Sequence, residues 1–198
     1  RIFMKNNILK KYLIVSLFAV SASAQSIVPT PPELNLTSYI LMDATTGKIL
    51  AESNSNSQIE PASMTKVMSG YIVADQIDQG MISNDDKVLI SRKAWKMEGS
   101  RMFIEVGKRV SVDDLLKGLV IQSGNDAAVA LAEYVAGSEQ IFVDVMNEYA
   151  SVLGLRNTLF QNSTGLPDTD HFTSVRDLAV LSNALIDNFP SHYDLYKE

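Results

Sequence analysis

The chain has 198 residues, with 17 Lys and Arg against 23 Asp and Glu, and its formal net charge is −6. This acidic balance argues against a nucleic-acid binder, because such proteins neutralise phosphates with a basic surface. Cysteine is absent, which excludes disulfide scaffolds, cysteine nucleophiles and cysteine-bound zinc, and the two histidines are too few for a three-histidine zinc site. Hydrophobic residues make up 46% of the chain, as in an ordinary globular domain.

Residues 1–24 have the pattern of a secretory signal peptide. Met4 is followed by lysines, by an apolar run over residues 12–20 and by Ala22-Ser23-Ala24, which correspond to the positive, apolar and cleavage regions of such a peptide. Arg1-Ile2-Phe3 precede this methionine and look like upstream translation or a cloning scar. The alternative is a retained membrane anchor, but the apolar run is short for a bilayer span. Export without cysteine favours a bacterial envelope.

The segment after the signal peptide is rich in proline. Residues 25–35 include Pro29, Pro31 and Pro32, and such a sequence predicts a stiff, extended lead-in. Four of the 17 basic residues lie in residues 1–24, so residues 25–198 hold 13 basic and 23 acidic residues, a net charge of −10.

The first predicted element of the folded part is a β-hairpin. Short apolar runs at residues 39–42 and 48–51 flank the turn Asp43-Ala44-Thr45-Thr46-Gly47, and the glycine suits a position with positive φ. A helix is predicted from Ser63 to Gly80. Apolar residues recur there at helical spacing, which predicts burial on one face: they are Met64, Val67, Met68, Tyr71 and Ile72.

The rest of the chain is mainly helical in prediction. Residues 87–110 mix short apolar runs with turn residues, which predicts small strands or irregular structure. Ser111 is expected to cap a helix that has Asp113 and Asp114 in its first turn. A second helix follows residues 123–125 and ends at Gly137.

Two further helices complete the predicted set. They run from Glu139 to about residue 153 and from Val175 to about residue 188, and Ser174 and Asp177 are spaced as a capping box for the second. A hairpin first and helices later, without regular alternation of strand and helix, predicts an α+β fold in which an antiparallel sheet packs with helices.

Ser63 and Lys66 form the first candidate catalytic pair. Residues three apart lie on the same face of a helix, so the two side chains can touch. A serine hydroxyl becomes a nucleophile when a neighbour takes its proton, and burial together with the helix N-terminus would lower the pKa of the lysine. To be largely neutral near pH 7, the lysine needs a pKa lower by roughly three. The alternative is that Ser63 is only a helix cap and Lys66 is solvated.

Ser123-Gly124-Asn125 lies in the turn between two predicted helices. Such residues are ordinary in helix connections. In a functional interpretation, the Ser123 hydroxyl relays a proton between Lys66 and a leaving amine, and the Asn125 amide binds a peptide group of the substrate.

Several ordered stretches of the chain resemble one family. Pro61-Ala62-Ser63-Met64-Thr65-Lys66 and Ser123-Gly124-Asn125-Asp126-Ala127 look like the first two motifs of penicillin-binding proteins and serine β-lactamases. From about Glu33 to the end the chain resembles, more narrowly, the D-alanyl-D-alanine carboxypeptidases of the penicillin-binding protein 5 type. Supporting stretches are residues 39–52, 99–103, 118–132 and 162–167, with His171.

This resemblance implies a complete set of roles. Ser63 would form the acyl-enzyme, Lys66 would accept the proton, Ser123 would assist and Asn125 would position the substrate. The substrate would be the pentapeptide stem of peptidoglycan, from which the terminal D-alanine is removed, and β-lactam antibiotics would acylate the same serine. No metal or organic cofactor and no nucleic-acid partner is implied. The expected location is the periplasm, peripheral on the outer face of the inner membrane.

The family's third motif, Lys-Thr-Gly, does not occur in the 198 residues. The resemblance implies that it follows Glu198, so that residues 36–198 are the N-terminal part of the catalytic domain and the sheet is incomplete at its C-terminal end. The family's second β-rich domain and its C-terminal amphipathic membrane anchor would also lie beyond Glu198. Without the third motif, the 198 residues alone need not be active, and a degenerate, inactive protein is the alternative.

Two related functions compete with a carboxypeptidase. A class A β-lactamase usually has Asp where this chain has Gly124, and its Glu-x-x-Leu-Asn segment is not found here. A non-catalytic penicillin sensor would stay acylated at Ser63, and would normally follow transmembrane helices. His171 could lie near the cleft and influence deacylation, although a loop histidine is more often structural.

Overall fold

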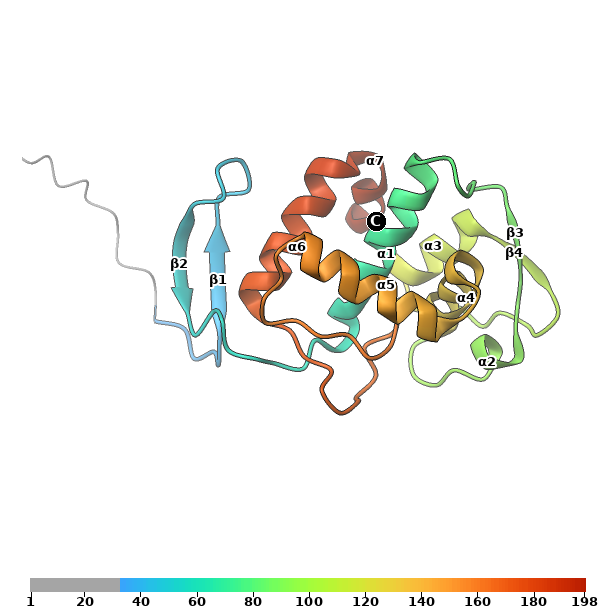
Figure 1. Cartoon of the computed structure of the whole chain (residues 1–198), viewed down its shortest axis with the longest axis horizontal. Coiled ribbons are helices and arrows are strands. Elements are labelled where there is room, and N and C mark those ends of the chain that lie inside the picture. The colour runs from blue at the N-terminus through green and yellow to red at the C-terminus, as the bar shows by residue number, and fades with distance from the viewer. Residues whose placement is uncertain (1–32) are drawn as a thin grey trace, which may run out of the picture. The chain divides into compact units, whose positions relative to one another are not determined.

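The computed structural model describes residues 33–198, and residues Leu34–Glu198 form one unit (Figure 1). The predicted signal peptide and most of the predicted lead-in lie outside the described residues. Residues 33–35 are exposed and belong to no helix or strand. Within residues 33–198, no helix is both long enough and apolar enough to span a bilayer.

The hairpin forms as predicted. Strands β1 (Tyr39–Met42) and β2 (Ile49–Ser53) pair antiparallel. The turn between them is closed by the Asp43 carboxylate, which accepts hydrogen bonds from the backbone N–H and the hydroxyl of Thr46, both at 2.7 Å. Gly47 has φ +68°, the left-handed conformation for which glycine was expected.

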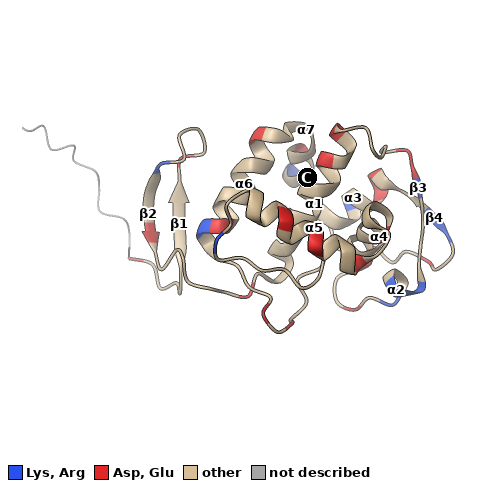
Figure 2. Ribbon diagram, in the orientation of Figure 1, with Lys and Arg blue, Asp and Glu red and all other residues tan. Residues whose placement is uncertain are grey.

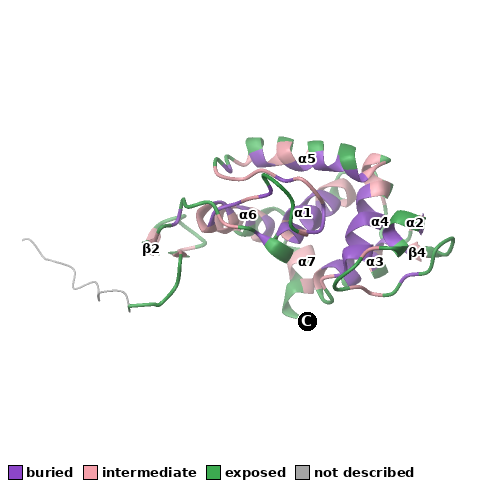
Figure 3. Cartoon of the chain, turned by 90° about the horizontal axis from the view of Figure 1, so that it is seen from below, coloured by how far each residue is buried: buried purple, intermediate pink, exposed green. Residues whose placement is uncertain are grey.

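Helix α1 (Thr65–Asp78) follows a 3₁₀ turn, η1 (Ala62–Met64), and is the central helix of the unit (Figure 3). The prediction of burial on one face is wrong. Met64 is 46% exposed, whereas the polar residues Thr65, Lys66 and Ser69 are buried. The reason is that helices from several later parts of the chain pack around α1, so nearly all sides of its first ten residues are covered.

Residues 87–111 form only a small second sheet. Strands β3 (Lys87–Leu89) and β4 (Arg109–Ser111) pair antiparallel, and a short helix, α2 (Arg92–Trp95), lies between them in sequence. The apolar run at residues 102–104 is irregular. This mixture of short strands and irregular backbone agrees with the prediction.

Helix α3 (Val112–Val120) begins at the predicted cap and α4 (Asn125–Ala136) ends at the predicted glycine, but α4 already includes Asn125, which was predicted to lie in the preceding turn. The Ser111 side chain accepts a hydrogen bond from the backbone N–H of Asp114, and Gly137 ends α4 at φ +80°. The alanine-rich α4 packs against the neighbouring helices and is buried over its first eight residues.

The remaining helices are α5 (Glu139–Val152), α6 (Val175–Asn188) and α7 (Pro190–Tyr193), followed by the 3₁₀ turn η2 (Asp194–Lys197). Only half of the capping box predicted for α6 forms. Ser174 accepts a hydrogen bond from the Asp177 backbone N–H at 3.1 Å, but the Asp177 carboxylate accepts bonds from Asn157 and Thr158 instead of reaching back to the cap. The box fails because the carboxylate holds a neighbouring loop.

The apolar core has two parts that meet at α1 and α4. One lies between α1, α5 and α6 and contains Phe142, Phe160 and Leu181, and the other lies between α3, α4 and the β3–β4 sheet and contains Ile90, Leu115 and Leu119. Acidic side chains are carried on α1, α4, α5 and α6 (Figure 2). Two small antiparallel sheets packed with helices confirm the predicted α+β class.

Candidate active site

Ser63 and Lys66 lie together at the start of α1. Ser63 is the exposed middle residue of η1, and its Oγ is 3.3 Å from the Nζ of Lys66. The alternative that Ser63 is a helix cap is wrong, because Met64 occupies the N-cap position and no side chain caps this helix. The Ser63 hydroxyl therefore makes no capping hydrogen bond to α1.

Lys66 is buried, with 5% of its surface exposed. Its Nζ donates a hydrogen bond to the carbonyl oxygen of Thr164 at 2.7 Å. Burial disfavours the charged ammonium and lowers the pKa of Lys66 from 10.5 to about 8. This pKa is higher than a largely neutral lysine at pH 7 would need, so about a tenth of Lys66 is neutral at that pH.

The turn between α3 and α4 is held in a strained conformation. Ser123 has φ +54°, which is unfavourable for a residue with a side chain. The backbone N–H of Gly124 donates to Gly118 at 2.9 Å and that of Asn125 donates to Ser100 at 2.7 Å, and these bonds fix the turn. Strain held in place by its surroundings is found often at functional sites.

Asn125 is buried, and its side-chain NH₂ donates to the Glu98 carbonyl oxygen at 2.6 Å. This bond leaves the amide oxygen as the group that can accept a bond from a ligand. Gly124 is closely surrounded: a Cβ there would lie 3.0 Å from Asp126 Oδ1 and 3.1 Å from the Gly118 oxygen. An aspartate, as in class A β-lactamases, would crowd this turn.

A cavity of about 70 Å³ joins the first two motifs. Ser63, Lys66 and Ser123 all line it, so the structure brings together residues that are 60 positions apart in sequence, whereas Asn125 does not contribute to its lining. The cavity has room for water but not for a peptide, since ligand pockets measure about 300–1,000 Å³. A peptide that reached these three side chains would therefore extend beyond this cavity.

Tyr196 also lines this cavity, which the sequence analysis missed. A Cβ at Gly70 of α1 would lie 3.0 Å from the Tyr196 hydroxyl and 3.6 Å from Leu119, so the absence of a side chain there lets Tyr196 approach closely. Burial raises the pKa of Tyr196 to about 12, so its hydroxyl stays neutral. No local pattern in the sequence distinguishes this tyrosine from the others.

The loop of residues 161–167 contacts the start of α1. Residues 162–167 were part of the family resemblance, but their contact with Lys66 was not predicted. The loop supplies the Thr164 oxygen that binds Lys66, and the Ser163 oxygen accepts a bond from Ser69 at 2.8 Å. Asn162 Oδ1 accepts bonds from the backbone N–H and the hydroxyl of Thr164 and from the Gly165 N–H. The loop is thus a tight turn that offers a carbonyl oxygen to the lysine.

An ion pair between the buried Glu139 and the exposed Lys93 anchors the same loop from the other side. Glu139 accepts bonds from the N–H and hydroxyl of Ser163, and its carboxylate lies 2.7 Å from Lys93 Nζ. Burial alone would raise the pKa of Glu139, but the bonds from Lys93 and Ser163 outweigh it and lower this pKa. Glu139 therefore stays ionised and holds the loop against α5.

The close approach of Gly165 to the backbone of Ala62 allows a test of this loop's packing. It has φ +83°, and a methyl group added there would overlap the carbonyl oxygen of Ala62, next to Ser63. We expect Gly165→Ala to lower the free energy of unfolding by about 3 kcal/mol or more, measured by urea denaturation. Gly154→Ala is the matched control, because Gly154 also has positive φ (+73°) but nothing within 4 Å, so only about 1–2 kcal/mol should be lost. Equal losses in the two variants would contradict the close contact.

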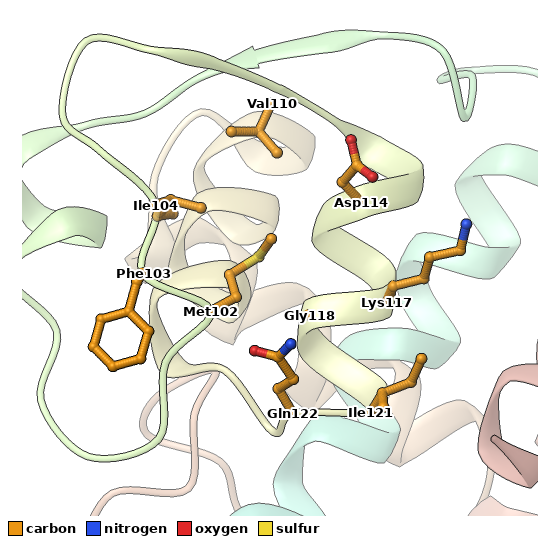
Figure 4. A pocket seen from close by; sticks show the side chains of 9 residues that line it. All are labelled: Met102, Phe103, Ile104, Val110, Asp114, Lys117, Gly118, Ile121 and Gln122. Atoms are coloured by element: carbon orange, nitrogen blue, oxygen red, sulfur yellow. The ribbon is translucent and has the colours of Figure 1, made fainter.

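A larger hollow of about 480 Å³ lies on another side of α3 (Figure 4). Met102, Ile104 and Gln122 are among its lining residues, and Phe103 points away from α3. None of the predicted site residues lines it. We take the small cavity as the candidate site, because among residues 33–198 it is there that a hydroxyl and a lysine of lowered pKa meet.

Comparison with known proteins gives one consistent result. Residues 25–198 match the peptidase S11 family model, described as D-alanyl-D-alanine carboxypeptidase. The chain is 47% identical over 176 residues to D-alanyl-D-alanine carboxypeptidase DacD of Escherichia coli strain K12, covering 86% of this chain and 45% of the relative. It is 43% identical over 171 residues to DacF of Bacillus subtilis strain 168, covering 85% and 44%.

Solved structures agree. The crystal structure of penicillin binding protein 6B from Escherichia coli superimposes with a TM-score of 0.84 at 46% identity, covering 87% of this chain and 56% of that one. The carboxypeptidase DacD from Francisella tularensis gives 0.85 at 38% identity, covering 96% and 43%. The chain thus spans about half the length of the curated relatives that it matches. On its fold, its motifs and these matches, the chain belongs to the peptidase S11 family of D-alanyl-D-alanine carboxypeptidases.

Proposed function

We propose that the protein is a serine-type D-Ala-D-Ala carboxypeptidase that removes the terminal D-alanine from peptidoglycan stem peptides and is acylated by β-lactams. One observation carries the proposal: a buried lysine with a lowered pKa lies 3.3 Å from the hydroxyl of Ser63. A serine hydroxyl next to a lysine that can be neutral is an activated nucleophile. Membership of the peptidase S11 family supports the same chemistry.

The proposed reaction has two steps. Ser63 Oγ attacks the carbonyl carbon of the D-Ala–D-Ala bond while the neutral amine of Lys66 takes its proton. The peptide C–N bond breaks, the leaving amine of D-alanine gains a proton, and an ester joins the stem peptide to Ser63. Ser123 lines the same cavity and is placed to pass that proton from Lys66 to the amine. Water then hydrolyses the ester and restores the serine.

The substrate and location are part of the proposal. Asn125 would hold a peptide group of the stem through its free amide oxygen, and a Lys-Thr-Gly motif following Glu198 would complete the site. The signal-peptide pattern at residues 1–24 supports export to the periplasm, and an amphipathic C-terminal anchor would hold the protein on the outer face of the inner membrane. Neither a nucleic-acid partner nor a cofactor is part of this mechanism.

The test is covalent labelling of the full-length encoded protein with benzylpenicillin. Intact mass should show one equivalent bound, peptide mapping should place it on the fragment that contains Ser63, and the adduct should be lost slowly. The same preparation should release D-alanine from a pentapeptide. Rapid turnover of penicillin would indicate a β-lactamase, and a permanent adduct without release of D-alanine would indicate a sensor. A folded protein without an adduct would refute the assignment of the nucleophile.

A further inference from the structure

His171 is buried and makes hydrogen bonds with both ring nitrogens. Its Nε2 lies 2.9 Å from the hydroxyl oxygen of Thr65, and its Nδ1 lies 3.1 Å from the backbone nitrogen of Gln161. Only 5% of the residue is exposed. The mechanism above uses neither this histidine nor Thr65, although Thr65 stands between Ser63 and Lys66.

The two bonds fix the protonation of the ring. The backbone of Gln161 can only donate, so Nδ1 must be the unprotonated, accepting nitrogen. The single proton of a neutral imidazole is then on Nε2, which donates to the Thr65 hydroxyl. A charged imidazolium would carry protons on both nitrogens and would lose the bond from Gln161.

The surroundings favour this neutral form. Phe160 packs against the His171 ring in a T-shaped arrangement with a centroid distance of 5.9 Å. On α1 the facing residue is the uncharged Thr65. Burial lowers the pKa of His171, and the carboxylate of Asp168 acts in the opposite direction without outweighing burial. His171 is therefore a neutral donor with a fixed direction near neutral pH.

The bond from His171 complements the one from Thr164. The carbonyl oxygen of Thr164 accepts a hydrogen bond from the Lys66 side chain. His171 bonds to the hydroxyl of Thr65, the residue before Lys66. Ala62, at the other end of this turn, has φ +47°, so the backbone that carries Ser63 is in an unfavourable conformation that its contacts must maintain. The segment of residues 161–171 thus makes two hydrogen bonds to the turn of residues 62–66, which carries Ser63.

We propose that His171 is a positioning residue for acylation, in which its Nε2–H, bonded to the Thr65 hydroxyl, holds the Ser63–Lys66 turn in the reactive geometry. The inference rests on the proposed function, because acylation at Ser63 is the step that it affects. It assigns His171 no contact with the substrate.

Two variants separate the two bonds of the ring. In His171→Gln the side-chain nitrogen occupies the place of Nε2, so the donor to Thr65 is kept and the acceptor for Gln161 is lost. In His171→Asn the amide oxygen occupies the place of Nδ1, so the acceptor is kept and the donor to Thr65 is lost. His192→Gln is the control. His192 is on α7; burial lowers its pKa and the charge of Asp78 opposes this, and Asp78 is at the far end of α1 from Lys66.

We expect His171→Asn to slow acylation by benzylpenicillin by about tenfold or more, since small displacements of a reacting group have large costs. His171→Gln should stay within about threefold of the parent, as should the control. An unimpaired His171→Asn, or a His171→Gln that is as slow as His171→Asn, would overturn the proposal. If His171→Asn does not fold, Thr65→Val and Thr65→Ser replace the pair: only the valine should slow acylation, and a normal rate for Thr65→Val also overturns the proposal.

A second measurement does not depend on penicillin. The pKa of Lys66, followed by NMR of its side-chain carbon next to Nζ, should rise from about 8 toward 10.5 in His171→Asn as the turn loosens and admits water, and should stay near 8 in His171→Gln. If the parent is not acylated at all, the proposed function fails, while this titration still decides whether His171 positions Lys66. An unchanged pKa in both variants would refute the positioning role.

Discussion

Ser63→Ala should take up no benzylpenicillin and release no D-alanine, while its melting temperature stays within about 1–2 °C of the parent. The chemistry is lost because the attacking oxygen is removed. Stability is kept because Ser63 is exposed and caps no helix, and exposed substitutions usually change the free energy of unfolding by less than about 0.5 kcal/mol. Intact mass after penicillin treatment and thermal unfolding followed by circular dichroism measure the two effects.

The chain offers matched controls in two serines that do cap helices. Ser111 accepts a bond from the Asp114 N–H at 3.1 Å, and Ser138 accepts one from the Ile141 N–H at 3.2 Å. Replacing either by alanine should cost about 1 kcal/mol, which is about 2–4 °C in melting temperature, and should leave the adduct intact. If Ser63→Ala behaved like these controls, Ser63 would be a structural residue and the proposed mechanism would fall.

The elements that the sequence predicted best are those defined by local chemistry. The hairpin turn depends on Gly47, α4 ends at a glycine in the left-handed conformation, and α6 begins at a serine cap, all of which act over a few residues. Burial of α1 was predicted wrongly because it depends on partners that fold around it from the rest of the chain. The spacing of apolar residues cannot show that polar residues such as Ser69 will also be covered.

The candidate site divides along the same line. Ser63 and Lys66 are three residues apart on one turn, so their contact follows from helix geometry. The groups that surround Lys66 come from far away in sequence: the Thr164 carbonyl that binds it is 98 residues distant, and Tyr196, which lines the same cavity, is further still. A carbonyl oxygen carries no side-chain signature, so only the folded structure could identify Thr164 as a partner.

Lys66→Met should slow acylation by about 10²–10⁴, the usual contribution of a positioned general base. In the parent, the acylation rate should increase about tenfold per pH unit up to pH 8 and level off above it, because the neutral fraction of a lysine with a pKa of about 8 follows that course. Lys66→Arg should not restore activity, since a guanidinium stays charged at any accessible pH. Stopped-flow acylation between pH 6 and 10 provides the profile. A rate that does not change across pH 8 would exclude Lys66 as the proton acceptor.

The same lysine should make the stability of the fold depend on pH. In the unfolded chain Lys66 keeps its proton up to pH 10.5, whereas the folded protein releases it near pH 8. Between these values the unfolded state binds more protons, so the stability of the parent should rise with pH relative to Lys66→Met, by at most about 3 kcal/mol.

Below pH 8 both states are charged, and the cost of burying the ammonium remains in full. At pH 7 that cost opposes the bond to Thr164, so Lys66→Met should unfold at a temperature equal to or above that of the parent, although it has lost its activity. Urea denaturation of both proteins at pH 7 and pH 10 tests both expectations. If the difference in the free energy of unfolding between the parent and Lys66→Met is the same at the two pH values, burial does not lower the pKa of Lys66.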